Sequence, residues 1–589
     1  MKHHFQLNSS IKSYLYTMRY LIILIVLSIG CRGAETEARP STANQSTYTL
    51  DNREHGVLGD SAMVVTAHPA ASLVGESILR AGGNAIDAAV AVQFALAVVY
   101  PNAGNLGGGG FMVLRLADGT SNTLDFREKA PSGASRDMFL NSNGEVSREK
   151  IESSHLAAGV PGSVEGMWQA HQKYGSMPWK DLVQPAIDLA TKGFTITQNQ
   201  AEDLSELQSE FKKRNPGKNY FIKTKWQTGD TLKQPDLAQT LIAVRDNGRA
   251  GFYEGAIAEK IVAEMQKNKG IMTADDLKNY NAVWRAPVQG TYRDYTVISM
   301  PPPSSGGVAL LQLLNMVENY PLKDYGLHTA ASMSIMTEAE KRVYADRAAW
   351  LGDPDFVRVP VNELLSKQYA QERMSGVDTN TNTPSKQIKA GVFDGYESEQ
   401  TTHFSIVDAK GNAVAITTTL NDSYGSKIVV QGCGFILNNE MDDFSAKPGE
   451  PNMYGLLGGE ANAIEPNKRM LSSMTPTIVV KDNDLFMVIG TPGGSTIITS
   501  VFQNIVNVID FDMTMQESIN APRFHHQWLP DHISVEKSFD GLVLSALEKK
   551  NYTISKREAI GRVDGILVHP NKLLEGGADP RGDDVAVGF

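Results

Sequence analysis

Two threonines are the residues of this sequence best placed to do chemistry. Thr401 opens the segment TTHFSIVD, and Thr419 lies near the end of the segment NAVAITTTL. The two segments flank Ala-Lys-Gly, a three-residue loop whose Gly411 can take the left-handed conformation that such hairpins need. A hairpin centred on this loop pairs the apolar Phe404 with Ile416 on one face and places Thr401 opposite Thr419 on the other. Two hydroxyl groups therefore meet where the strands end.

A threonine hydroxyl is a weak nucleophile unless a base lies beside it. The threonine's own α-amine can act as that base once the preceding peptide bond is cut. Such an amine has a pKa of about 8, so it is substantially neutral at physiological pH. The bond to be cut here joins Gln400 to Thr401. Threonine is also a good strand former, and the hairpin alone would favour that structural interpretation.

The elements around the hairpin indicate a layered protein of helices and sheets. MVVTA at Met63 predicts a strand followed by two helices, and the second helix is rich in alanine. Small residues let a helix lie close to a sheet, so we expect this helix to be buried. A strand over 485–489 runs into Gly493 and Gly494, and a helix begins near Ser495. Two glycine amides at a helix start are donors for an anion.

Composition excludes several classes of protein. The 589 residues are 41% hydrophobic and 21% charged, which is typical of a globular protein with a large core. A net charge of -11 without a long basic run argues against binding to nucleic acid. Only Cys31 and Cys433 are present, so a mature chain without Cys31 has no internal disulfide.

Three features could suggest a cofactor, a metal or a second nucleophile. The glycine run 107–110 follows a helix and precedes a strand, which is not the order of a nucleotide-binding loop, and close backbone packing explains it better. His525 and His526 are adjacent on an extended segment and point apart, so we interpret them as structural. Cys433 has no adjacent base and is interpreted as a packed residue near the site. We therefore expect no cofactor and no metal.

The N-terminus is predicted to be a targeting segment. LIILIVLSIG is an apolar run that follows Arg19 and is too short to span a bilayer. Translation from either Met1 or Met18 is compatible with it. Cys31 follows Ser-Ile-Gly, which is similar to a bacterial lipoprotein box, and simple secretion with loss of Cys31 is the alternative. Residues 1–31 are thus predicted to be a signal peptide and 32–56 a polar tether to an exported, periplasmic body.

Many ordered blocks of the chain resemble the γ-glutamyltransferase (γ-glutamyltranspeptidase) family. They are GGNAIDAAVA, GGGGFM, DFREKAP, GVPGSVEGM and MPPPSSGGV, then TTHFSIVD, TLN, NNEMDDFSAKPG, PNKRMLSSMTPTIV and GTPGGS. The resemblance implies a precursor that cuts itself into a large subunit, 57–400, and a small subunit, 401–589. Together these form one α+β body, the αββα sandwich of the N-terminal-nucleophile hydrolases.

The resemblance also implies roles for the catalytic residues. Thr401 matches the nucleophile, which attacks first its own preceding carbonyl at Gln400 and later the γ-glutamyl carbonyl of a substrate. Thr419 matches a threonine that hydrogen-bonds the nucleophile. Gly493 and Gly494 match the oxyanion hole, whose amides hold the negative oxygen of the tetrahedral intermediate.

A second set of matches concerns the substrate. A γ-glutamyl group carries an α-carboxylate and an α-ammonium, so we expect a cationic and an anionic clamp at opposite sides of its pocket. Arg127 with two serines matches the carboxylate clamp, and Asp443 with two further residues matches the ammonium clamp. Tyr454 lies in a segment similar to the lid over that pocket. The matched partners are Ser472, Ser473, Asn421 and Glu440, of which Glu440 is glutamine in some bacterial members.

The sequence thus predicts transfer of the γ-glutamyl group of glutathione or a related amide to water, an amino acid or a peptide. A related acylase or a polyglutamate transferase with the same nucleophile is the alternative within this superfamily. A lipid-anchored binding protein without turnover is the alternative from another class. The intact nucleophile and oxyanion donors disfavour the binding protein.

Overall fold

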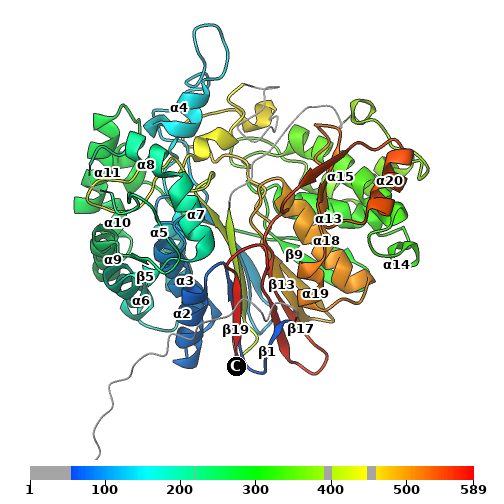
Figure 1. Ribbon diagram of the computed structural model, residues 1–589, viewed down its shortest axis with the longest axis horizontal. Coiled ribbons are helices and arrows are strands. Elements are labelled where there is room, and N and C mark those ends of the chain that lie inside the picture. The colour runs from blue at the N-terminus through cyan, green and yellow to red at the C-terminus, as the bar shows by residue number, and fades with distance from the viewer. Residues whose placement is uncertain (1–54, 218, 390–400, 448–458) are drawn as a thin grey trace, which may run out of the picture. The chain divides into compact units, whose positions relative to one another are not determined.

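Two seven-stranded sheets lie face to face and are covered on their outer faces by helices (Figure 1). The computed structural model describes residues 55–217, 219–389, 401–447 and 459–589, which belong to one unit, 51–589. The order of layers is helix, sheet, sheet, helix. The predicted αββα architecture is therefore confirmed.

The first sheet carries the predicted hairpin at its centre. Its strand order is β19-β2-β10-β11-β3-β4-β7, and β10 pairs antiparallel with both β2 and β11. The strands are β2 Met63–Thr66, β3 Gly109–Arg115, β4 Ser121–Asp125, β7 Val283–Arg285, β10 Thr402–Val407, β11 Ala413–Thr419 and β19 Val585–Gly588. Because β10 is a central strand, the residue that immediately precedes it is held inside the molecule.

The second sheet supplies the loop that faces the end of that hairpin. Its order is β1-β18-β17-β13-β12-β9-β8, and every neighbouring pair is antiparallel. The strands are β1 Val57–Gly59, β8 Val288–Tyr292, β9 Tyr295–Ser299, β12 Thr477–Lys481, β13 Asp484–Gly490, β17 Asp564–Val568 and β18 Leu574–Gly577. The chain leaves β13 through Gly490 toward Gly493 and Gly494.

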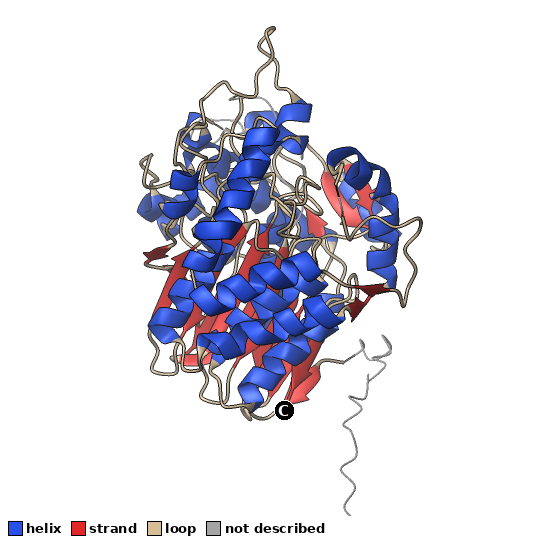
Figure 2. Ribbon diagram, turned by 90° about the vertical axis from the view of Figure 1, so that its left-hand side faces the viewer, coloured by secondary structure: helices blue, strands red, loops and turns tan. Residues whose placement is uncertain are grey.

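Helices on the first sheet explain why the N-terminal part of the chain is so rich in alanine. α3 Ala85–Val99 has every residue buried, and it begins at a capping box between Asn84 and Asp87. Figure 2 shows helices crossing in front of the strands. This layer contains α2 Pro69–Arg80, α3, α5 Ser163–Tyr174, α6 Trp179–Lys192 and α9 Pro235–Asn247. The burial predicted for the alanine-rich helix is confirmed.

The helical layer on the second sheet includes α18, the helix that begins just after Gly493 and Gly494. α18 Thr496–Asp510 packs against α13 Gly306–Val317, and α13 contacts α15 Ala330–Trp350. A third apolar cluster fills the space between the sheets and includes Phe111, Ile298 and Val488. Full burial of such a side chain stabilises the fold by roughly 1.5–3 kcal/mol. The core therefore fixes both sheets against each other.

The strand at Met63 and the two helices that follow it are confirmed, as are the strand over 485–489 and the helix that begins near Ser495. The signal peptide, the polar tether and Cys31 lie outside the described residues. Among the helices that the structure describes, none is both long and apolar enough to cross a membrane.

Candidate active site

The hairpin has the register that the sequence predicts. Phe404 lies opposite Ile416 and Thr402 opposite Thr418, so the next position outward sets Thr401 against Thr419. Gly411 in the connecting loop has φ 85°, the left-handed conformation that was expected. Both hydroxyl residues are buried, with Thr401 4% and Thr419 2% exposed. A nucleophile in this position is shielded from bulk water.

The polar face of the hairpin is satisfied by its own side chains. The imidazole of His403 contacts Thr417 Oγ1 at 2.9 Å through Nδ1 and Ser405 Oγ at 3.0 Å through Nε2. Burial lowers the pKa of His403 to about 3, so the ring is neutral. Gly490 of β13 lies against this ring, because a Cβ there would stand 2.3 Å from His403 Cε1. The polar face thus packs tightly against the second sheet just below Thr401.

One cavity collects most of the predicted site residues. Its lining combines the two threonines, one cation, two acids, an amide, two serines and a glycine amide. The lining residues are Arg127, Thr401, Thr419, Asn421, Glu440, Asp443, Ser472, Ser473, Met474, Gly494 and Ile497. Gly493 lines a neighbouring cavity, which Thr401 also lines. Gln400 and Tyr454 lie outside the described residues.

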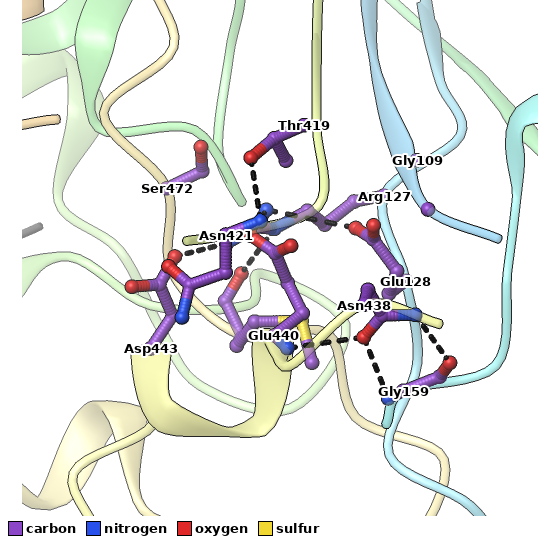
Figure 3. A network of polar contacts seen from close by, with 12 residues as sticks. Gly109, Arg127, Glu128, Gly159, Thr419, Asn421, Asn438, Glu440, Asp443 and Ser472 are labelled. Atoms are coloured by element: carbon purple, nitrogen blue, oxygen red, sulfur yellow. Dashed lines mark hydrogen bonds and ion pairs between the residues drawn. The ribbon is translucent and has the colours of Figure 1, made fainter. Parts of the chain in front are cut away.

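Arg127 stands at the centre of the charged groups of this cavity (Figure 3). Its guanidinium donates to Glu440 and to Asp443 and lies 3.5 Å from Glu128 Oε2. We expected the cationic and anionic clamps at opposite sides of the pocket, and this expectation was wrong because they are in direct contact. A buried guanidinium needs counter-charges at hydrogen-bonding distance, which the acids supply.

The acids of this cluster outnumber the cation, and burial acts on all of them. Burial raises the pKa of Glu128 to about 7 and that of Glu440 well above its usual range, while the charge of Arg127 opposes both shifts. Burial also raises the pKa of Asp443. Among the described residues, Glu440 Oε2 and Asp443 Oδ1 are buried without a hydrogen-bond partner. These two oxygens are acceptors available to an ammonium group inside the cavity.

Asn421 lies beside Thr419 with its backbone in the left-handed region. Its φ is 73°, and its backbone nitrogen donates to Thr419 Oγ1 at 2.8 Å. Its side chain donates to the carbonyl of Asn439 at 3.0 Å, just before the 3-10 turn Glu440–Asp443. Asparagine tolerates the left-handed region better than most residues. The residue therefore links the end of the hairpin to the acids.

The serine pair lies where the chain returns from Arg469 toward β12. Ser472 accepts through its carbonyl from Ser305 N at 2.6 Å, and its Oγ accepts from Met474 N at 3.2 Å. Arg347 on α15 donates to Ser473 Oγ at 3.2 Å and to Ser305 Oγ at 2.7 Å. Burial lowers the pKa of Arg347 to about 10, so it stays a cation at neutral pH.

Two charged residues beside the cavity were not predicted from the sequence. Arg347 lies on α15, and the charged residues of this helix give its sequence the pattern of an exposed segment. In the structure those charged residues are buried. Glu128 follows Arg127 directly and could have been found as a second acid in DFREKAP. With them, the cavity region holds two cations and three acids.

Gly493 and Gly494 form the turn into α18. They have φ 134° and 57°, both in the region that favours glycine, and Thr496 N donates to Gly493 O at 3.1 Å. The turn leaves its amides at the start of a fifteen-residue helix, where backbone donors and the helix dipole favour negative charge. An oxygen that becomes negative next to Thr401 would be stabilised there.

His525, His526 and Cys433 are all buried. His525 contacts Thr499 Oγ1 at 2.9 Å, whereas His526 pairs with Asp531 at 3.3 Å, so the two rings have separate partners as expected. Cys433 is buried, and burial raises the pKa of its thiol to about 11. It lines neither of the cavities that Thr401 lines.

The fold and this site define the class of protein. Two stacked sheets between helical layers, with a buried threonine at the start of a central strand and backbone donors facing it, describe an N-terminal-nucleophile hydrolase. The model of the Gamma-glutamyltranspeptidase family matches residues 71–589. The chain therefore belongs to the gamma-glutamyltranspeptidase family, which is a family of enzymes.

Known proteins with similar sequences and structures agree with this assignment. The glutathione hydrolase proenzyme of Escherichia coli strain K12 is 49% identical over 97% of this chain and 99% of its own length. A cephalosporin acylase from Bacillus halodurans superposes with a TM-score of 0.79 at 25% identity, over 95% of this chain and 99% of the acylase. The gamma-glutamyltranspeptidase of Helicobacter pylori is 49% identical, with a TM-score of 0.54 over 55% of this chain and 94% of its own.

Proposed function

We propose that the protein is a γ-glutamyltransferase and glutathione hydrolase that uses Thr401 as an N-terminal nucleophile. The observation that carries the proposal is the cavity in which Thr401 faces Arg127 and two acids. A γ-glutamyl group fits this charge pattern, because its α-carboxylate can bind the guanidinium and its α-ammonium the free carboxylate oxygens. The name of the Escherichia coli relative points to the same donor.

Maturation would come first. Thr401 Oγ attacks the carbonyl of Gln400, which converts the peptide bond into an ester and frees the α-amine of Thr401. Water then hydrolyses the ester, leaving a large subunit that ends at Gln400 and a small subunit, 401–589. The freed amine is a base with a pKa of about 8 beside its own hydroxyl.

The catalytic cycle uses the same hydroxyl. The α-amine takes the proton of Thr401 Oγ as the oxygen attacks the γ-carbonyl of the donor, and the amides of Gly493 and Gly494 hold the resulting oxyanion. The C–N bond breaks, the leaving amine takes the proton, and a γ-glutamyl ester remains on Thr401. Water or an acceptor amine then attacks this ester, releasing glutamate or a new γ-glutamyl amide. Thr419 positions the nucleophile.

The remaining parts of the proposal concern the pocket and the location. Ser472 and Ser473 would complete the carboxylate site, Asn421 the ammonium site, and Tyr454 would belong to a lid.

We place the protein in the periplasm after export, with a lipid anchor at Cys31 or with Cys31 removed. Intact-mass analysis of the mature protein distinguishes a diacylglyceryl-cysteine from simple secretion.

Thr401→Ala tests the central claim. Without the hydroxyl neither scission nor acyl transfer can occur, so we expect one uncut chain on a denaturing gel and no detectable release of a chromogenic γ-glutamyl anilide. The wild-type protein should give two fragments, the smaller beginning Thr-Thr-His-Phe. Two fragments broken at the same bond in the variant would refute self-cutting.

An acylase activity is the second candidate, because the structure is similar to that of a cephalosporin acylase. The two buried acids disfavour it, since they suit a donor with an α-ammonium group. A cephalosporin whose acyl side chain lacks an amine separates the two candidates. Faster turnover of that compound than of the γ-glutamyl anilide would favour the acylase.

A further inference from the structure

Two buried aspartates that the proposed chemistry does not use lie between the two sheets. Asp564 is the first residue of β17 in the second sheet and pairs with Gly490 of β13. Asp584 directly precedes β19 at the edge of the first sheet. The hydroxyl of Ser405 on β10 donates to the carbonyl of Asp564 at 3.2 Å. The two acids therefore lie where the sheets meet, close to the strand that follows Thr401.

The carboxyl groups of these two residues face each other without a donor in the part of the chain that the structure describes. Asp564 is 0% and Asp584 2% exposed, and all four carboxyl oxygens are buried without a hydrogen-bond partner among the described residues. The two groups lie within hydrogen-bonding reach of each other. A carboxylate only accepts hydrogen bonds, whereas a protonated carboxyl group also donates one. One shared proton would therefore satisfy the pair.

Arg562 is the cation that faces both acids. A Cβ at Gly582 would stand 2.1 Å from Asp584 Oδ2 and 2.7 Å from Arg562 Nη1, so the guanidinium lies just across from the Asp584 carboxyl group. The guanidinium also donates to the hydroxyl of Tyr100, and its charge acts on Asp564 as well. One positive charge thus faces two acids, and a buried charge without compensation is costly. A single proton on the pair makes the charges equal.

The third acid of this region has cations of its own. Asp579 accepts from Arg523 Nη2 at 2.5 Å and from Arg581 Nη1 at 3.2 Å. Burial opposes ionisation there, but the charges of Arg523 and Arg581 lower the pKa of Asp579 below its usual range. Arg581 also donates to Glu536 at 2.6 Å. Asp579 is therefore ionised and does not compete for the proton of the pair.

The other titratable side chains around the pair keep one protonation state near neutral pH. Burial raises the pKa of Tyr100 to about 12, and burial lowers the pKa values of His403 on β10 and His68 after β2 to about 3. Asp583, the residue before Asp584, accepts from Thr197 Oγ1 at 2.6 Å. Among these described neighbours, the charge that changes near neutral pH is therefore that of the pair itself.

Burial acts on both acids in the direction that a shared proton requires. Burial and the charge of Asp584 raise the pKa of Asp564 well above its usual range, although Arg562 opposes the shift. Burial also raises the pKa of Asp584 to about 6, again against the charge of Arg562. An aspartate of the unfolded chain has a pKa of about 4. Above about pH 6 the folded protein thus keeps a proton that the unfolded chain has released.

We propose that Asp564 and Asp584 share one proton and form a pH-sensitive contact between the two sheets. The proton joins the start of β17 to the start of β19. In alkali the proton leaves, and two carboxylates then face each other beside one guanidinium, which favours separation of the strands.

The sign of the effect follows from the two states of the chain. Because the pair binds its proton more tightly in the folded protein, its contribution to stability is complete below about pH 4. That contribution is lost as the pH rises through the pKa of the folded pair. The pair therefore stabilises the fold in acid and ceases to do so in alkali.

The test measures unfolding in urea as a function of pH. The parent is the uncut Thr401→Ala chain, whose two halves cannot separate, so the result does not depend on the proposed function. Asp564→Asn replaces the protonated carboxyl group by an amide, which donates to Asp584 and has no proton to lose. Relative to this variant, the unfolding constant of the parent should rise by about tenfold per unit between about pH 6 and about pH 8.

A second variant and a control accompany this measurement. Asp584→Asn leaves Asp564 opposite an amide, so it should lose the same pH dependence and replaces the first variant if that one does not fold. Asp137→Asn changes an exposed aspartate and should keep the pH dependence of the parent. At neutral pH the infrared difference spectrum between the parent and either pair variant should show loss of the carbonyl band of a protonated carboxyl group.

Three results would overturn the proposal. A parallel pH dependence in the parent and the pair variants is one, because a merely structural contact would change stability equally at every pH. A parent chain whose stability does not decrease between about pH 6 and about pH 8 is another, and this result needs no variant to fold. An infrared band that persists unchanged in the pair variants would show that the two acids hold no proton.

Discussion

At the residue scale, the site is built from charges that are buried together. Arg127, Glu128 and Glu440 are each at most 1% exposed at the side chain. Charges placed this deep are tolerated only when they compensate each other. When a substrate that carries one positive and one negative group binds, ion pairs to its charged groups can therefore replace the ion pairs within the site.

Arg127→Lys tests this exchange. A lysine ammonium cannot contact two carboxylates or a substrate carboxylate through a planar fork, so we expect the KM of a γ-glutamyl donor to rise by about tenfold or more. Chain scission should persist, because the nucleophile is untouched. Steady-state kinetics and a denaturing gel measure the two effects.

The matched control is Arg80→Lys, which changes a surface ion pair with Glu76. Exposed pairs of this kind contribute roughly 0–1 kcal/mol, so neither KM nor stability should change measurably. An unchanged KM in Arg127→Lys would contradict the role of Arg127 in holding the donor.

At the element scale, the position of Thr401 depends on how β10 packs between its neighbours. His403, two residues along, fills the space left by Gly490 on the facing sheet. The contact joins the hairpin to β13, the strand that leads into the turn of Gly493 and Gly494. Movement of one strand would therefore change the distance between Thr401 and the backbone amides of that turn.

Gly490→Ala tests this contact. The new methyl group would stand 2.3 Å from the His403 ring, closer than atoms pack, so the sheets must separate locally. We expect a loss of roughly 1–3 kcal/mol in stability and a fall in kcat of about 10²-fold, because a shift of 1 Å misplaces the nucleophile. Thermal unfolding and anilide turnover measure the two losses.

Gly541→Ala is the control for this substitution. No atom lies within 4 Å of the Cβ that it adds at the exposed start of α20 Gly541–Lys549, so stability and turnover should remain those of wild type. Wild-type stability and turnover in Gly490→Ala would show that the two strands do not set the position of Thr401.

The elements were predicted well from the sequence wherever local pattern decides structure. The alternation of the hairpin and the left-handed Gly411 fixed the register of β10 and β11, and the alanine content of α3 predicted its burial. The contact of Arg127 with Glu440 could not be read in this way. It joins residues 313 positions apart, and their spacing in the fold is set by both sheets.

The burial of α15 also could not be predicted from its local sequence pattern. Its charged residues, Arg347 among them, are buried although a polar helix ordinarily indicates solvent exposure. Periodicity reports how apolar a face is and carries no information about which distant polar groups satisfy a buried charge. Of the two serines that accept from Arg347, Ser473 lies 126 residues later in the chain and Ser305 lies 42 residues earlier.

At the scale of the whole molecule, the proposed cut at 400/401 crosses both sheets. β10 and β11 pair with β2 and β3 in the first sheet, and β12 pairs with β9 in the second. The apolar clusters between each helical layer and its sheet, and the cluster between the two sheets, also contain residues from both sides of the cut. Neither fragment has a core of its own.

We therefore expect the two fragments of the mature protein to stay associated. They should elute together in size-exclusion chromatography under native conditions and separate only in denaturant, because parting them would expose sheet edges and the apolar surface of the core. Uncut Thr401→Ala should elute at the same volume. Elution of the small fragment alone from native wild type would contradict the shared core.

The 4% exposure of Thr401 has a consequence for the lifetime of the enzyme. Ordinary chain ends project into solvent, where aminopeptidases trim them. An end created at Thr401 instead begins inside a cavity, flanked by paired strands, and no exopeptidase could close around it. The residue on which turnover depends would thus be protected from degradation by the architecture that activates it.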